Sequence, residues 1–110
     1  MSDPAESSPF EVRLVDSDGT ALVVLSGELD LVTAPQLEAV LASVPEDRRI
    51  VFDLRALRFM DSSGVGLLVA AAQRKTPAGT RLGCIAGPRQ VQRILQITGA
   101  DRLVEWVAAP

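Results

Sequence analysis

Two adjacent hydroxyls precede a strongly apolar stretch in the middle of the chain. Asp61, Ser62 and Ser63 are followed by Gly64 and by an almost wholly apolar run to Ala72. Aspartate and serine are typical of helix starts, because their short side-chain oxygens accept hydrogen bonds from the free amides of the first turn. We therefore predict a helix here, with Ser63 capping its first turn and Ser62 facing outward. One hydroxyl suffices for a cap, so the other is available for a second role.

The predicted helix is more apolar than packing on one face of a sheet requires. Its apolar residues form a stripe at helical spacing with further apolar residues at the sides: Val65, Leu68, Val69 and Ala72, then Leu67, Ala70 and Ala71. An apolar flank beside exposed hydroxyls, here including Val65 and Leu67, is typical of a surface that docks another protein. The competing interpretation is a helix cap with no further role.

Composition excludes several kinds of chemistry for these hydroxyls. The 110-residue chain has no histidine, which removes histidine-based triads, histidine acid-base catalysis and most transition-metal sites. Lys75 is the only lysine and lies several turns from Ser62, so a serine-lysine pair has no support. Cys84, the only cysteine, lies in an apolar run and is expected to be an inert core residue. We predict a protein that is not an enzyme and has no metal or cofactor.

Charge and hydropathy bound the partners and the compartment. Eleven basic and fourteen acidic residues are interspersed, for a net charge of −3, so a nucleic-acid or anionic membrane surface is not expected. The start of the chain has no signal-peptide pattern, and no apolar run approaches the ~18 residues that span a bilayer. We expect a cytoplasmic protein with one domain over residues 10–107, a disordered tail at 1–9 and a short tail at 108–110.

Five strands and three helices are predicted around the hydroxyls. The strands are apolar or alternating runs at residues 10–15, 22–25, 49–54, 81–86 and 103–107, and the helices lie at 33–44, 61–75 and 88–98. Turn residues at 16–19 make the first two strands an antiparallel hairpin, whereas helical crossovers make the later strands parallel. The predicted fold class is α/β, a mixed sheet of about five strands in the order β-β-α-β-α-β-α-β with helices packed on it.

The predicted sheet brings two polar segments to one edge. Open α/β sheets place their ligands at the carboxyl ends of the strands. Residues 27–32 leave the second strand there, and we predict that they form a loop in which Glu28 is a turn residue. Residues 61–64 leave the third strand at the same edge, so Asp30 is expected near Ser62. Thr33 is predicted to cap the helix that follows the loop.

Two short motifs resemble a known family. Gly-Glu-Leu-Asp at 27–30 precedes Phe-Met-Asp-Ser-Ser-Gly-Val-Gly at 59–66 by about thirty residues. This pattern resembles the anti-sigma factor antagonists of the STAS (sulphate transporter and anti-sigma antagonist) domain family, over about residues 10–107. The resemblance implies a protein that, when unphosphorylated, binds an anti-sigma factor serine kinase of the histidine-kinase-like ATPase type and so releases a sigma factor. Phosphorylation of the first serine after the aspartate ends this activity, and a serine phosphatase restores it.

By position, the resemblance implies that Ser62 is the phosphorylation site. It also implies that the small residues Gly64 and Gly66 let a partner's backbone come close. The expected partner-binding residues surround the serine: Glu28, Asp30, Asp61, Ser63, Gly64, Val65, Gly66 and Leu67. One alternative is an accessory subunit of a membrane lipid or anion transport system, a role of related domains. An enzyme using Ser62 as nucleophile lacks both a histidine and a Gly-x-Ser-x-Gly elbow. The Gly-x-Gly spacing at 64–66 is too short to indicate nucleotide binding.

Overall fold

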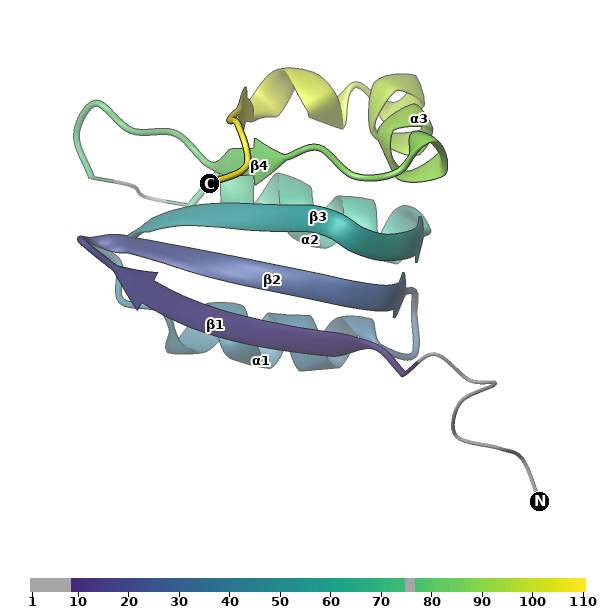
Figure 1. The fold of residues 1–110 in the computed structure, drawn as a ribbon, viewed down its shortest axis with the longest axis horizontal. Helices are drawn as coiled ribbons and strands as arrows, with labels where there is room; N and C mark the ends of the chain where they lie inside the picture. The colour runs from purple at the N-terminus through teal and green to yellow at the C-terminus, as the bar shows by residue number, and fades with distance from the viewer. Residues whose placement is uncertain (1–8, 75–76) are drawn as a thin grey trace.

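The computed structural model describes residues 9–74 and 77–110 (Figure 1). Its elements are, in order, β1 (Glu11–Ser17), β2 (Thr20–Leu29), α1 (Ala34–Ser43), β3 (Arg49–Met60), α2 (Ser62–Ala72), β4 (Gly83–Ile85), α3 (Arg89–Thr98), the 3-10 helix η1 (Ala100–Leu103) and β5 (Glu105–Trp106). The strands form one sheet in the order β1-β2-β3-β4-β5. The first pair is antiparallel and the others are parallel, as predicted. The predicted tail lies outside the described residues, except for Pro9.

One apolar core joins the sheet to the helices. Figure 1 shows α1 and α2 side by side behind β1, β2 and β3, with α3 beyond β4. Side chains alternate along β2, where Val23 and Leu25 are fully buried and their neighbours only partly so. They meet Phe52 of β3, Leu37 of α1 and Leu68 of α2 in the core. Apolar residues that alternate along the strands, and others that recur at helical spacing along the helices, are thus buried in one shared layer.

The two strands that lead to the serines are longer than predicted. β2 runs on through Gly27 and Glu28 to Leu29, so the prediction that these residues form a loop is wrong. They remain extended because β2 pairs there with β3, with Leu29 opposite Met60. The register shifts twice, so that β3 carries two extra residues in bulges. Gly27 has φ +86°, and a Cβ there would lie 2.7 Å from the carbonyl oxygen of Pro9, so the motif glycine is required by the backbone.

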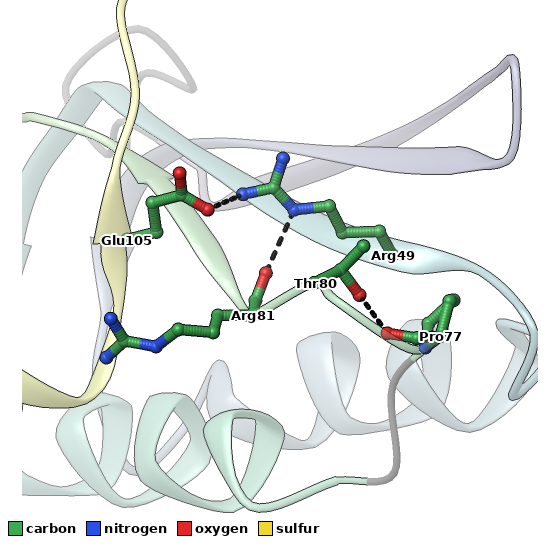
Figure 2. A network of polar contacts seen from close by, with 5 residues as sticks. All are labelled: Arg49, Pro77, Thr80, Arg81 and Glu105. Carbon is green, nitrogen blue, oxygen red and sulfur yellow. Dashed lines mark hydrogen bonds and ion pairs between the residues drawn. The ribbon is translucent and has the colours of Figure 1, made fainter.

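The opposite edge of the sheet is closed by polar contacts. Arg49, the first residue of β3, donates from Nε to the carbonyl oxygen of Arg81 at 2.9 Å and pairs with Glu105 of β5 at 2.5 Å (Figure 2). The Thr80 hydroxyl donates to the Pro77 carbonyl at 2.7 Å in the connection before β4. The two contacts of Arg49 join the start of β3 to the segment before β4 and to the start of β5, at the sheet edge opposite the serines, so their role is in stability. β4 and β5 are shorter than predicted, and η1 was not predicted.

Candidate functional site

Asp61 caps α2. Its Oδ1 accepts hydrogen bonds from the backbone N–H groups of Ser63, at 2.8 Å, and Gly64, at 3.3 Å. Its own N–H donates to the carbonyl oxygen of Leu29 at 3.1 Å, which ties the helix start to the end of β2. A carboxylate in this position also interacts favourably with the helix dipole. The predicted helix start is confirmed, and the aspartate is its cap.

The two serine hydroxyls are not used by the helix. Ser62 is the first residue of α2 and is exposed, whereas Ser63 is half-buried. Within residues 9–74 and 77–110, neither hydroxyl has a hydrogen-bond partner. The prediction that the Ser63 hydroxyl caps the first turn is therefore wrong, because the Asp61 carboxylate takes the amides instead. Ser62 is exposed, and its hydroxyl is not engaged by the first turn of α2.

Of the four residues that follow Ser63, two are buried and two lie at or near the surface. Gly64 and Val65 are buried, and a Cβ on Gly64 would lie 2.7 Å from Cγ of Met60. The small size of Gly64 thus serves the packing of α2 against the strand ends, and Val65 belongs to the core rather than to an exposed apolar flank. Gly66 is exposed with nothing within 4 Å of its Cβ position, and Leu67 is half-buried. Of these four residues, only Gly66 and Leu67 therefore contribute to the surface.

Asp30 orders the loop between β2 and α1. Its Oδ1 accepts hydrogen bonds from the N–H groups of Val32 and Thr33, both at 3.0 Å. The Thr33 hydroxyl accepts from the Asp30 N–H at 3.0 Å and lies 2.8 Å from the carbonyl oxygen of Glu28, to which it donates. Thr33 occupies the N-cap position of α1, but its hydroxyl makes no cap bond, contrary to the prediction, because the loop uses it. Since Asp30 follows Leu29, it lies at the same edge as Asp61.

Glu28 lies on a strand rather than in the predicted turn. Its carboxylate is 3.4 Å from the guanidinium of Arg58 on β3, and both side chains are about half exposed. A pair in this setting is screened by water and contributes little to stability. Glu28 is accordingly available to a partner at small cost to the fold.

Three large apolar side chains are exposed around this edge, and the sequence analysis missed them. Leu31 is 75% exposed, Val32 is 82% exposed and Phe59 is 45% exposed. Leu31 and Val32 lie in the loop that Asp30 orders, and Phe59 is the last residue but one of β3. The sequence does contain an indication of two of them, because the apolar pair Leu31 and Val32 lies inside a segment predicted to be a polar loop. Such side chains beside a free hydroxyl indicate an interaction surface.

A buried carboxylate supports the strand that carries the site. Asp53 is 5% exposed, and it accepts hydrogen bonds from the backbone N–H of Arg55 at 3.1 Å and from the guanidinium at 2.8 and 3.0 Å. The side-chain hydrogen bonds from Arg55 hold the pKa of Asp53 below its usual value. These bonds lie where β3 first bulges, so they help to fix the register of the strand toward Asp61.

Cys84 is fully buried, and the loss of hydration raises the pKa of its thiol to about 12.

In the part of the chain that the structure describes, no three potential metal ligands cluster. Among those same residues, no helix is long and apolar enough to cross a membrane.

Comparison with known proteins identifies the fold family. A family model described as "Mlab, STAS domain" matches residues 12–105. The chain belongs to the STAS domain family. The anti-sigma-F factor antagonist RsfB of Mycobacterium tuberculosis is 32% identical to this STAS domain over 93 residues, which are 83% of this chain and 75% of RsfB. The anti-sigma-B factor antagonist of Staphylococcus aureus is 33% identical over 84 residues, 74% of this chain and 78% of the relative.

Solved structures agree with this assignment. An anti-sigma factor antagonist from Mycobacterium paratuberculosis superposes with a TM-score of 0.77 at 33% identity, covering 92% of this chain and 87% of the other. The anti-sigma factor antagonist SpoIIAA in its unphosphorylated form gives a TM-score of 0.62 at 23% identity, covering 91% and 89%. The second similarity concerns the fold alone.

Proposed function

We propose that this STAS domain is an anti-sigma factor antagonist that is switched by phosphorylation of Ser62. The observation that carries the proposal is the free, exposed Ser62 hydroxyl at a helix start whose cap is supplied by Asp61. The hydroxyl can be modified without loss of the cap. The antagonist names of the relatives support the same role.

The partner is an anti-sigma factor serine kinase of the histidine-kinase-like ATPase type, which the unphosphorylated protein binds in the cytoplasm. Binding releases the sigma factor, and a serine phosphatase reverses the modification. The contact surface comprises the exposed apolar residues Leu31, Val32 and Phe59 together with Gly66 and Leu67 of α2. Apolar contacts of this kind can be buried without a desolvation penalty for charge.

The switch follows from charge at the first turn of α2. A phosphoserine adds about −1.5 to −2 charges at pH 7. The amides of Ser63 and Gly64, which would otherwise receive it, already bind Asp61. A partner that had buried the neutral hydroxyl would then have to desolvate a dianion beside a carboxylate. A poorly paired interfacial charge costs on the order of 2 to 5 kcal/mol, or roughly 30- to 4,000-fold in affinity.

Calorimetric titration of purified variants into the anti-sigma kinase of the same organism tests the proposal. Ser62→Ala should bind with nearly wild-type affinity and accept no phosphate, whereas Ser62→Asp should bind much more weakly. Ser63→Ala should bind normally and still be phosphorylated. Ser17→Asp places the same charge on an exposed serine at the opposite edge of the sheet and is the matched control. Phosphate on Ser63, or full affinity in Ser62→Asp, would refute the assignment, and binding to a permease component instead would favour the transport role.

A further inference from the structure

A groove of about 270 Å³ opens between α1 and α2. Its walls are apolar, with Leu41 and Ala42 contributed by α1 and Leu67 and Ala70 by α2. The buried side chain of Ile50 lies beneath them. Both alanines are exposed and both leucines are half-buried, so this apolar surface faces solvent. The packing of the domain itself leaves the groove unfilled.

Arg74 fixes the shape of this groove. It also lines the groove, and it follows the end of α2. Its guanidinium donates to the carbonyl oxygen of Leu41, at 2.9 Å, and to that of Val44, two acceptors at the carboxyl end of α1. The Leu41 carbonyl oxygen also accepts from the Val44 N–H, so Arg74 adds a second donor there, and its two bonds join the helices. The groove is therefore preformed, and its occupant would not have to pay for ordering it.

Glu38 gives the rim of the groove a negative charge. It is exposed on α1, lines the groove and forms no ion pair within the described ranges. Arg74, which also lines the groove, keeps its positive charge, but its guanidinium is directed to carbonyl oxygens at the end of α1 and does not pair with Glu38. The exposed carboxylate of Glu38, unpaired among the described residues, therefore favours a partner that carries a basic group beside an apolar one.

The groove is continuous with the surface around the serine. Ser62, Gly66 and Ala70 are all exposed, and their spacing of four residues places them along one face of α2. Eight residues of helix span about 12 Å, so Ser62 and the groove fit within one interface of ordinary size. Gly66 lies between them and allows a partner backbone to pass closely.

We propose that the kinase inserts an aliphatic or aromatic side chain into this groove and places a lysine or arginine against Glu38. This inference rests on the proposed function, since it adds a second anchor to the Ser62 interface. A side chain held in a preformed apolar pocket beside the switch would supply affinity that does not depend on the hydroxyl.

The test fills the groove from an exposed position. Ala42→Phe should weaken binding of the purified kinase at least tenfold, whereas Ala39→Phe, on an exposed residue of α1 outside the groove, should stay within twofold of wild type. Glu38→Lys should weaken binding more than Glu38→Gln. Circular dichroism and thermal melting establish that each variant is folded. In methyl NMR spectra, kinase binding should shift the signals of Leu41 and Ile50, two groove residues that the proposed Ser62 surface does not include.

The outcomes separate this inference from the proposed function. If Ala42→Phe and Glu38→Lys bind like wild type while Ser62→Asp is weakened, the groove is not an anchor, yet the switch stands. If the wild-type protein binds no anti-sigma kinase at all, both proposals fail. Methyl shifts confined to the region of Ser62 would also overturn the groove contact.

Discussion

Replacing Asp61 with alanine should destabilise the domain and change what a phosphate on Ser62 does to it. The substitution removes the acceptor that binds the amides of Ser63 and Gly64. Loss of a cap costs about 0.5 to 2 kcal/mol, and loss of the negative charge at the helix start costs about 0.3 to 1 kcal/mol more. The expected decrease in the free energy of unfolding is therefore about 1 to 3 kcal/mol. Asp61→Asn should lose less, because the amide oxygen still accepts.

Phosphorylation should have opposite effects in the two backgrounds. In the wild type the phosphate meets the Asp61 carboxylate, and two unit charges 4 Å apart in water repel by about 1 kcal/mol. In Asp61→Ala the amides of Ser63 and Gly64 are unoccupied, so the phosphate acts as the cap and stabilises the helix start by about 0.3 to 1 kcal/mol. The difference between the two effects should be about 1 to 2 kcal/mol.

Urea unfolding followed by far-ultraviolet circular dichroism measures this coupling on four proteins, each background with and without phosphoserine at position 62. Equal effects of phosphorylation in both backgrounds would show that the carboxylate and the phosphate do not compete for the same amides. Ser63→Ala is the control, expected within about 0.5 kcal/mol of wild type because its hydroxyl makes no hydrogen bond to any of the residues that the structure describes. A loss as large as that of Asp61→Ala would mean that the hydroxyl caps the helix after all.

Three further predictions follow from the scaffold. Asp30→Asn keeps an oxygen for the loop amides and should melt near the wild-type temperature, whereas Asp30→Ala should lose about 1 to 3 kcal/mol; equal melting of both would contradict the loop contacts. The lowered pKa of Asp53 means that its carboxylate stabilises the fold above the usual value of 3.8, and that this contribution is lost as pH falls through the lowered value. The stability gap between wild type and Asp53→Asn, measured in urea, should therefore be full at pH 7 and shrink as the pH falls below 3.8; a constant gap would refute the ion pair. Cys84, with its pKa raised to about 12, should react with thiol reagents slowly when native and quickly when denatured, and fast native labelling would show that the core opens.

Periodicity predicted the number, type and order of the main elements because each apolar pattern had a face to bury. The end of β2 was missed because Gly27 and Glu28 are poor strand formers on local criteria, and the end of β3 because its apolar residues do not alternate regularly. Gly27 and Glu28 are held extended by pairing partners far away in the sequence, and the bulges of β3 have no local signature. The short helix η1 was missed for a related reason, since four residues give no helical period to detect.

Residue types located the site, but they did not assign the bond that each residue makes. Asp61, Ser62 and Ser63 are all good capping residues, so only backbone geometry distinguishes the carboxylate that caps from the hydroxyl that is free. The role of Gly64 in packing depends on Leu29 and Met60, which reach it from two strands. The α1–α2 groove arises from helix spacing and has no counterpart in the sequence.

At this edge of the sheet, the carboxylates of Asp30 and Asp61 are already hydrogen-bonded in the free protein. The Oδ1 atoms of Asp30 and Asp61 each accept from two backbone N–H groups, so a partner that covers these carboxylates need supply hydrogen bonds only to their Oδ2 atoms. Burying an already bonded group costs much less than burying a bare one. A phosphate on Ser62 would find the amides of Ser63 and Gly64 already bonded to Asp61, so its burial would leave a dianion without hydrogen bonds from those two groups. The discrimination between the two states should thus reside in the phosphate, and it should fall when Asp61→Ala returns two amides to it.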